Sequence, residues 1–417
     1  MKEFKIEGGH KLTGTIKISG AKNAALALIP AALLTNKKVK IYNVPNISDI
    51  ENIKEILRHL NVKMKEEKEY LEIDASNLVN DAVPEEISKK LRASYYFMSA
   101  LLGKYKKVEM YFPGGCSIGA RPIDQTLKAF EALGAKVIEE NNKYTITAEE
   151  LIGTDISLDM PSVGATVNAM LVSTKAKGIT KIYNAAKEPE IVSVATFLNN
   201  MGAKIKGAGT STITIEGVNN LSGAFTEVIP DRIEAGTYII AGALLGNNLK
   251  ITNIIPKHVE SLTEKLKEMG VPLTIKEDSI IVSKANNLKP VKVKTLGYPG
   301  FPTDLQQPLT TLLTQVNGTS TLEETIYENR FKNVEYLNKM GANIEIIGQK
   351  IKIKGPTKLT GTNVEATDLR AGACMVLAAL IADNTTTINS IEHVLRGYEN
   401  IIEKLSNVGA KIELIDN

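Results

Sequence analysis

The ten residues 113–122 carry the side chains best suited to chemistry in this chain. They read Pro-Gly-Gly-Cys-Ser-Ile-Gly-Ala-Arg-Pro, with Cys116 behind two glycines and Arg121 shortly after it. Three glycines and two prolines exclude a helix or a central strand, so we expect the thiol on a loop. Neighbouring N–H groups and the Arg121 guanidinium favour a thiolate there. The alternative for Cys116 is a buried structural cysteine, which is the role that Cys374 fits in its apolar run.

The composition is that of an ordinary globular protein. The 417 residues are 43% hydrophobic and 23% charged, and the length predicts two or three domains. The formal net charge of +3 implies no strongly basic face, which argues against nucleic-acid or membrane partners. Two cysteines in different settings suggest no disulfide framework and favour a cytoplasmic location. The N-terminus has no signal-peptide pattern, and no apolar run is a convincing membrane span.

An amphipathic helix, a glycine-like step and a hairpin recur six times along the chain. Apolar residues at helical spacing precede each step, and an alternating hairpin pattern follows it. Glycine suits the step because it adopts the left-handed conformation that ends many helices. The six steps, 68 to 73 residues apart, are Asn61, Gly134, Gly202, Gly270, Gly341 and Gly409.

Each repeat also contains a second helix that is apolar nearly all round, as buried helices are. These helices are expected at residues 24–34, 93–102, 165–173, 235–245, 305–314 and 371–382. Polar residues stand at or before their starts, namely Lys22-Asn23, Arg92, Ser162, Asp231-Arg232, Asp304 and Asp368 to Arg370. Ordinary caps would explain one such start, but six in phase predict helix N-termini aimed at one cleft, where an anion binds.

The repeats divide most simply into three plus three. The pattern breaks near residues 221–230, and the first strand, within residues 4–18, can pack with either half. The period is too long and irregular for a short-repeat solenoid. The chain is thus expected to be an α/β protein of two domains.

Several motifs together resemble the UDP-N-acetylglucosamine 1-carboxyvinyltransferase family. Besides residues 113–122 they are Lys22-Asn23 and residues 162–166, 184–191, 230–234, 302–304, 328–331, 368–371 and 396–399. The resemblance spans nearly the whole chain. It implies a two-domain inside-out α/β barrel of six βαβαββ units, three per domain, with the active site in the cleft between the domains. It assigns residues 22–229 to one domain, and residues 1–21 with 230–417 to the other.

The resemblance implies a reaction at the first committed step of peptidoglycan, and hence cell-wall, synthesis. The enolpyruvyl group of phosphoenolpyruvate passes to the 3′-hydroxyl of UDP-N-acetylglucosamine, and phosphate is released. Cys116 is implied as the proton donor, adduct-forming residue and target of the epoxide fosfomycin, and Asp304 as the base for the hydroxyl. A plain helix cap is the alternative for Asp304. Lys22, Arg121 and Arg396 suit the phosphate, Arg370 with Arg396 suits the carboxylate, and Asn23 lies beside the transferred group.

The same resemblance implies the nucleotide-sugar contacts. They are Asn23, Arg92, Arg121, Pro122, Ile123, Asp124, Gln125, Met160, Pro161, Ser162, Val163, Gly164, Asp304 and Ile326. Two positions depart from the family pattern. Thr126 replaces a usual histidine, which removes a ring contact near the nucleotide, and Met160 replaces a polar residue, where backbone groups can still serve.

Other functions predict features that the sequence lacks. The four histidines have no paired ligand spacing, and there is no phosphate loop or dinucleotide fingerprint, so we expect no metal and no cofactor. The nearest alternative is transfer to another acceptor such as shikimate 3-phosphate, on the same fold without a loop cysteine of this type. An RNA 3′-phosphate cyclase-like enzyme would need a nucleophilic histidine. A ring-like clamp or scaffold would leave Cys116 without a task.

Overall fold

The computed structural model describes residues 2–114 and 123–416, which form two compact units. The first unit comprises residues 20–114 and 123–229, and the second comprises residues 2–19 and 230–416. Each unit has a hydrophobic core of its own. The chain passes between the units after Ser19 and again after Ile229. In the described ranges, no helix has the length and apolar character that a membrane crossing requires.

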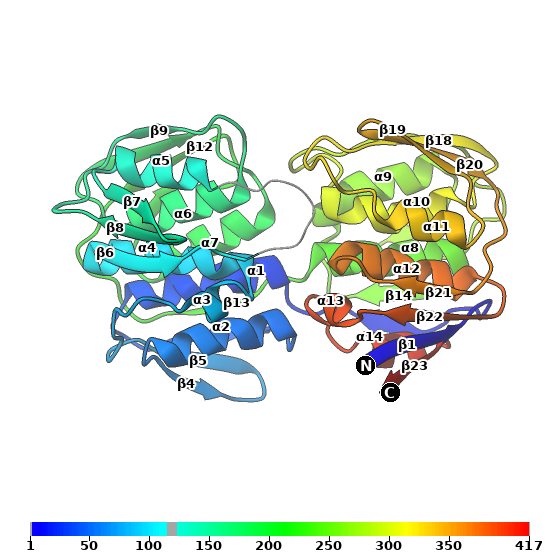
Figure 1. Ribbon diagram of the computed structural model, residues 1–417, viewed down its shortest axis with the longest axis horizontal. Helices are drawn as coiled ribbons and strands as arrows, with labels where there is room; N and C mark the ends of the chain where they lie inside the picture. Colours follow the sequence, from blue (N-terminus) through cyan, green and yellow to red (C-terminus); the bar gives the residue numbers. More distant parts are fainter. Residues whose placement is uncertain (1, 115–122, 417) are drawn as a thin grey trace. The chain divides into compact units, whose positions relative to one another are not determined.

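The first unit, blue to green in Figure 1, is built around three buried helices. They are α1 (Lys22–Ala31, continued by η1, Ala32–Leu34), α4 (Tyr96–Tyr105, preceded by η2, Arg92–Tyr95) and α6 (Val163–Ser173). The more amphipathic helices are α2 (Ser48–His59), α5 (Asp124–Ala132) and α7 (Pro189–Asn200), with a short α3 (Glu85–Ser88). The first sheet has the strand order β13 (Phe225–Glu227), β3 (Val39–Tyr42), β5 (Tyr70–Asp74), β4 (Lys63–Glu66). The second has the order β6 (Lys107–Tyr111), β8 (Lys143–Thr147), β7 (Lys136–Glu140). The third has the order β9 (Asp155–Ser157), β10 (Ile179–Tyr183), β12 (Thr212–Glu216), β11 (Lys204–Lys206).

The second unit repeats this plan. Its buried helices are α8 (Arg232–Leu245), α10 (Gln306–Leu313, preceded by η4, Thr303–Leu305) and α12 (Leu369–Ile381). Its other helices are η3 (Pro256–Val259), α9 (Glu260–Glu268), α11 (Asn333–Lys339), α13 (Glu392–Leu395) and α14 (Ile401–Ser406). One sheet of this unit has the strand order β2 (Thr15–Lys17), β14 (Leu249–Thr252), β16 (Ser279–Val282), β15 (Leu273–Ile275). The next has the order β17 (Lys292–Lys294), β18 (Gly318–Glu323), β20 (Lys350–Gly355), β19 (Ile344–Ile347). The last has the order β21 (Asn363–Glu365), β22 (Thr385–Asn389), β1 (Lys2–Glu7), β23 (Lys411–Asp416).

One pairing pattern recurs in the sheets. A short strand runs parallel to a second strand, which is followed by an antiparallel pair, as in β9, β10, β12 and β11. In the sheet of β6 the short strand is reduced to a parallel bridge between Val83 and Met110. In the last sheet β1 lies between β22 and β23, where the other sheets have a hairpin strand. The sixth hairpin is therefore completed by the N-terminus rather than by local chain.

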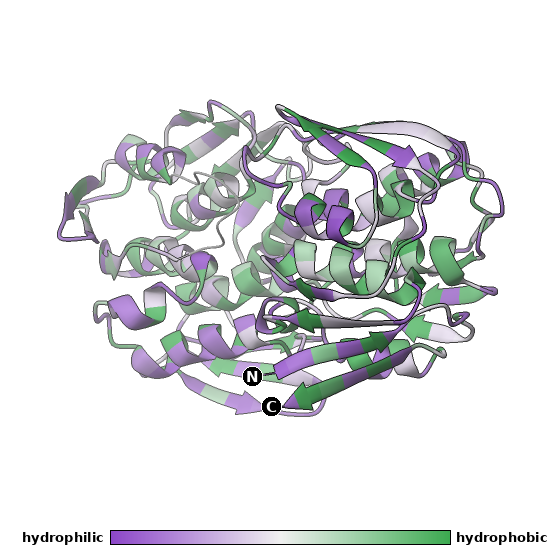
Figure 2. Ribbon diagram, turned by 45° about the vertical axis from the view of Figure 1, so that its right-hand side comes forward, coloured by the Kyte–Doolittle hydropathy of each residue, from purple (hydrophilic) through white to green (hydrophobic). Residues whose placement is uncertain are grey.

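The hydropathy pattern explains why these elements form. The buried helices present apolar residues all round, whereas β1 alternates hydrophilic and hydrophobic residues with Phe4 and Ile6 facing the core (Figure 2). The six predicted helix-ending steps all have positive φ, from 55° at Asn61 to 107° at Gly341. The prediction of a left-handed residue at the end of each amphipathic helix is confirmed.

Candidate functional site

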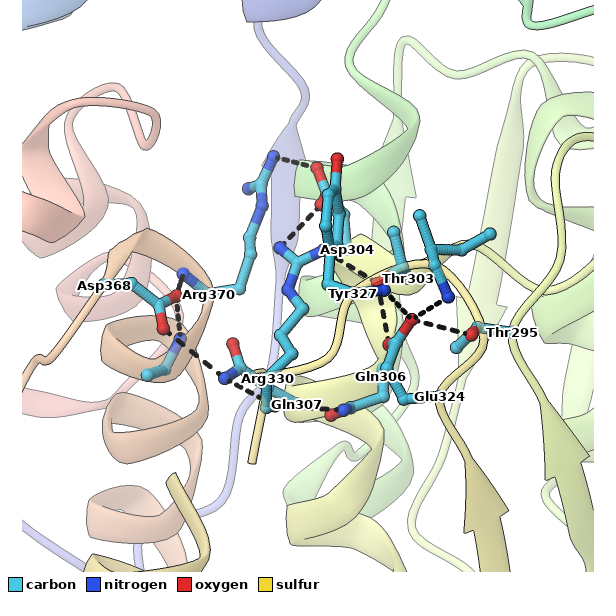
Figure 3. A network of polar contacts seen from close by, with 12 residues as sticks. Thr295, Thr303, Asp304, Gln306, Gln307, Glu324, Tyr327, Arg330, Asp368 and Arg370 are labelled. Carbon is cyan, nitrogen blue, oxygen red and sulfur yellow. Dashed lines mark hydrogen bonds and ion pairs between the residues drawn. The ribbon is translucent and has the colours of Figure 1, made fainter. Parts of the chain in front are cut away.

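The second unit contains a cluster of charged side chains around Asp304, shown in Figure 3. Asp304 lies in η4, directly before α10. The Arg330 Nη2 donates a hydrogen bond to Asp304 Oδ1 at 2.8 Å, and the Arg370 Nη2 donates to Oδ2 at 3.1 Å. Both arginine side chains are only 4% exposed, while that of Asp304 is 25% exposed. One partly accessible carboxylate therefore holds two buried guanidinium groups.

These contacts set the protonation of Asp304. Burial acts to raise the pKa of Asp304, but the Arg370 and Arg330 guanidinium groups outweigh it and hold that pKa well below its usual range. The alternative that Asp304 is a helix cap is wrong, because neither η4 nor α10 has a side-chain cap hydrogen bond. In this arrangement Asp304 is an ionised but weak base.

Arg370 is also held from its other side. Its Nη1 donates to the Tyr398 hydroxyl at 3.2 Å, and that hydroxyl lies 2.9 Å from Thr237 Oγ1 on α8. Arg396, which was expected at the substrate phosphate, is the residue that ends α13 and is two positions before Tyr398. The guanidinium of Arg370 is thus fixed at one nitrogen by a neutral group and at the other by Asp304, and its planar fork suits a carboxylate.

Helix starts in the second unit differ in their chemistry. Asp231 caps α8 by accepting from Ile233 N at 2.8 Å and Glu234 N at 3.0 Å. Asp368 caps α12 by accepting from the backbone N–H groups of Arg370 and Ala371. The cap explanation is therefore correct for Asp231 and Asp368.

In the first unit, Lys22 is the first residue of α1. Its Nζ lies 2.7 Å from Oδ2 of Asp49, whose side chain is fully buried in the first turn of α2. The Lys22 side chain is 11% exposed, so its charge is positioned rather than solvated. Asn23 follows it in the same turn and is partly buried.

Three of the expected nucleotide-sugar residues, Arg92, Ser162 and Gly164, are found at or near the start of α6. Ser162 caps this helix by accepting from Ala165 N at 3.3 Å. Gly164 packs against Tyr95, because an added Cβ at Gly164 would lie 1.7 Å from the Tyr95 hydroxyl. The Arg92 guanidinium lies over the Tyr95 ring, 5.8 Å from its centroid. The structure thereby brings Arg92 and Gly164 together through Tyr95.

A second link joins two of the expected segments. Gln125 on α5 accepts from the backbone N–H groups of Asp159 at 2.8 Å and Met160 at 3.3 Å. The Met160 side chain is exposed and Thr126 is buried, with 2% of its surface accessible. Ile123 is buried, Asp124 and Pro161 are exposed, and Val163 is partly buried at the start of α6.

Three expected site residues, Cys116, Arg121 and Pro122, lie outside the described residues. Ile326 is tied to the Asp304 cluster through Glu324, which accepts from Ile326 N at 2.8 Å. Sequence reasoning assigned no role to several participants, although Thr303, Arg330 and Tyr398 stand inside the motifs at 302–304, 328–331 and 396–399. The others, outside the motifs, are Asp49, Tyr95 and Glu324. No group of three His, Cys, Asp or Glu side chains in the described ranges is arranged to hold a metal ion.

Comparison with known proteins defines first the class and then the family. A family model described as EPSP synthase (3-phosphoshikimate 1-carboxyvinyltransferase) matches residues 6–405. The enolpyruvyl transferase NikO from Streptomyces tendae superposes with a TM-score of 0.91 at 27% identity, covering 99% of both chains. EPSP synthase from Acinetobacter baumannii superposes with a TM-score of 0.77 at 19% identity, covering all of both chains. The predicted fold class, a two-domain inside-out α/β fold, is confirmed.

A sequence relative is more similar still. The UDP-N-acetylglucosamine 1-carboxyvinyltransferase 2 of Geobacillus kaustophilus (strain HTA426) is 53% identical over 412 residues, which cover 99% of this chain and 96% of the relative. The chain therefore belongs to the UDP-N-acetylglucosamine 1-carboxyvinyltransferase family of enolpyruvyl transferases.

Proposed function

We propose that this protein transfers the enolpyruvyl group of phosphoenolpyruvate to the 3′-hydroxyl of UDP-N-acetylglucosamine, with release of phosphate, in peptidoglycan synthesis. The observation that carries the proposal is 53% identity, over 99% of the chain, to a UDP-N-acetylglucosamine 1-carboxyvinyltransferase. The paired arginines at Asp304 support it, since the carboxylate of phosphoenolpyruvate needs such a partner.

The reaction is an addition followed by an elimination. In the addition, the Cys116 thiol gives a proton to the methylene carbon, the sugar oxygen bonds to the adjacent carbon, and Asp304 takes the hydroxyl proton. In the elimination the two roles are exchanged: the Cys116 thiolate takes a proton back from the methyl carbon, the carbon–oxygen bond to phosphate breaks, and the phosphate leaves with the proton that Asp304 had accepted, which restores the double bond. We assign Lys22, Arg121 and Arg396 to the phosphate and Arg370 with Arg396 to the carboxylate.

Asp304 must gain basicity before it accepts a proton. Its ion pairs with Arg370 and Arg330 hold its pKa low in the free protein. We infer that the carboxylate of phosphoenolpyruvate replaces Asp304 as the acceptor of the hydrogen bond from Arg370. Losing one of two guanidinium partners raises the pKa of Asp304 toward the ordinary carboxyl range. The substrate therefore activates its own base.

We further propose that the two compact units are the two domains of the family fold. The first domain would contribute Lys22 and the start of α6 to substrate binding, and the second would contribute Asp304 and Arg370. We also propose a cytoplasmic location, because a reactive thiol at Cys116 and a free thiol at Cys374 both suit a reducing compartment.

Phosphate release from phosphoenolpyruvate tests the function. The assay uses UDP-N-acetylglucosamine or shikimate 3-phosphate as acceptor, each with and without fosfomycin. We expect phosphate release with UDP-N-acetylglucosamine as the acceptor but not with shikimate 3-phosphate. Fosfomycin treatment should abolish this release. Release with shikimate 3-phosphate would favour the alternative acceptor, which is supported by the match to the EPSP synthase family model. Release with neither acceptor would refute the transferase proposal.

A further inference from the structure

Glu324 is a buried carboxylate that joins two segments of the candidate site. It directly follows β18 and has no exposed surface. Its Oε1 accepts from the Thr295 hydroxyl at 2.9 Å and from the backbone N–H groups of Ile326 at 2.8 Å and Tyr327 at 3.3 Å. Its Oε2 accepts from the Thr303 hydroxyl at 2.7 Å (Figure 3). Four donors on one carboxylate offset the cost of burying its charge.

Thr303 extends these contacts to the base. Its hydroxyl oxygen accepts from Arg330 Nη1 at 2.8 Å, and the other terminal nitrogen of Arg330 donates to Asp304. A guanidinium only donates and a carboxylate accepts, so the single Thr303 proton must point to Glu324. The direction of every hydrogen bond from Arg330 through Thr303 to Glu324 is thereby determined.

We propose that Glu324 is a positioning residue which, through Thr303 and Arg330, holds Asp304 in register with the backbone at Ile326. The inference rests on the proposed function, in which Asp304 and Ile326 meet the same nucleotide sugar. Glu324 binds the Ile326 N–H with one oxygen and the Thr303 hydroxyl with the other. A single rigid carboxylate therefore sets the spacing between the base and the segment that binds its substrate.

The hydrogen bonds from the backbone N–H groups of Ile326 and Tyr327 do not by themselves explain why the Glu324 carboxylate also reaches the Thr303 hydroxyl. A carboxylate that only closed the turn at residues 324–327 would satisfy its role with Oε1. The second oxygen, Oε2, instead accepts from the Thr303 hydroxyl on η4, the element that also contains Asp304. Without the Thr303 hydroxyl, Arg330 would lose one of its two η4 acceptors. Its guanidinium would then be held by the hydrogen bond to Asp304 and by the Tyr327 ring, 5.2 Å from its centroid, which fixes its orientation less tightly.

Four variants of the full chain separate positioning from general stability. Thr303→Val removes the hydroxyl at nearly constant volume, Thr303→Ser keeps it, and Glu324→Gln removes the charge at constant shape. Thr310→Val is the matched control, because the Thr310 hydroxyl is buried in the following helix α10 and donates to the Gln306 carbonyl of its own helix at 2.9 Å.

Steady-state kinetics are measured with both substrates, together with the thermal unfolding temperature. We expect Thr303→Val and Glu324→Gln each to lower kcat about tenfold or more, with the KM values changed less than about threefold. Thr303→Ser should stay within about twofold of the parent, as should Thr310→Val. The double variant of Thr303→Val with Glu324→Gln should lose no more than the worse single variant, because both break one chain of contacts. Additive losses, or a kcat for Thr303→Val equal to that of Thr310→Val, would overturn the proposal.

Amide hydrogen exchange of the ligand-free protein gives a readout that needs no turnover. We expect Thr303→Val to speed exchange at Ile326 and Tyr327, although Thr303 touches neither amide, and Thr310→Val to leave both rates unchanged. If the parent protein releases no phosphate, the proposed function fails while this exchange result still decides the role of Glu324. Unchanged exchange in Thr303→Val would refute the link between the segments.

Discussion

Arg370 Nη2 donates to Asp304 Oδ2 at 3.1 Å, so the expected carboxylate-binding arginine is held by the expected catalytic base. The two proposed roles therefore draw on the same guanidinium nitrogen. We infer that a substrate carboxylate bound by Arg370 weakens the ion pair that keeps the pKa of Asp304 low. Substrate binding and the basicity of Asp304 would then be coupled through this one ion pair.

The first prediction follows from this competition. Asp304→Asn should bind phosphoenolpyruvate about tenfold more tightly while losing nearly all phosphate release, because a neutral amide competes less for Arg370. Isothermal titration calorimetry measures the Kd, with each protein also carrying Cys116→Ala so that no thiol adduct forms. The control is Asp383→Asn, since Asp383 pairs with Lys358 at an exposed position. Unchanged or weaker binding by Asp304→Asn would contradict the competition.

The second prediction concerns pH and Glu234, a residue of α8 whose side chain is 2% exposed. Its carboxylate accepts from Ser19 N at 2.8 Å and lies 2.6 Å from Lys404 Nζ. Burial raises the pKa of Glu234 to about 7, although Lys404 opposes the shift. A carboxyl with a raised folded pKa binds more protons in the folded state, so its stabilising contribution is present at low pH and is lost as the pH rises through about 7.

Glu234→Gln should remove this dependence. The free energy of unfolding of the parent, relative to the variant, should fall by up to about 1.4 kcal/mol per pH unit between roughly pH 5 and pH 7. Urea titrations at several pH values measure the difference. Glu260→Gln serves as the control, because Glu260 pairs with Lys257 at the surface and is 50% exposed. A difference that does not vary with pH would show that Glu234 stays ionised throughout this range.

The third prediction separates the two cysteines of the chain. Cys374 has no exposed surface on α12, and its sulfur lies 3.2 Å from Thr311 Oγ1. Burial raises the pKa of the Cys374 thiol to about 12, which confirms its expected structural character. We expect one thiol per chain to react with an alkylating reagent in the native protein and two in denaturant.

The cysteine variants identify which thiol reacts. Cys116→Ala should abolish native labelling, phosphate release and inactivation by fosfomycin, whereas Cys374→Ala should keep all three and lose about 1 to 2 kcal/mol of stability. Mass spectrometry after labelling gives the number of modified thiols, and urea titration gives the stability. Native labelling that persists in Cys116→Ala would refute the assignment of the reactive thiol.

Local sequence patterns predicted the elements better than the contacts of the site. The six buried helices and the six positive-φ steps depend on nearby residues, so periodicity and glycine placement reveal them. Asp304 was recognisable at a helix start, but its arginine partners lie 26 and 66 residues further along the chain. Spacing carries no signal for such pairs, because tertiary packing alone brings them together. Glu324 was missed for the same reason. Thr303 lies in the motif at 302–304, but its role depends on its contacts with Glu324 and Arg330, which spacing does not reveal.

The sixth hairpin shows a similar limit. The pattern after Gly409 contains one strand, β23, and its partner β1 comes from the start of the chain. The local sequence pattern predicts a hairpin there. An antiparallel pair is indeed present, but its second strand is β1 rather than a neighbouring segment, so the predicted connection is wrong. Pairing between the two ends of a chain leaves only the alternation of β1 itself as a signal.

The last prediction concerns the start of α6, where Gly164 leaves room for Tyr95. An added Cβ at Gly164 would lie 1.7 Å from the Tyr95 hydroxyl and 2.8 Å from its Cζ, so the Tyr95 ring must move. That ring lies beneath the Arg92 guanidinium, an expected nucleotide-sugar contact, and its displacement should raise the KM for UDP-N-acetylglucosamine about tenfold with a smaller change in kcat. Steady-state kinetics of Gly164→Ala test this, with Gly103→Ala as the control, since the nearest atom to that Cβ is the end of the Leu34 side chain at 3.2 Å. An unchanged KM in Gly164→Ala would show that the Tyr95 contact does not position the nucleotide-sugar site.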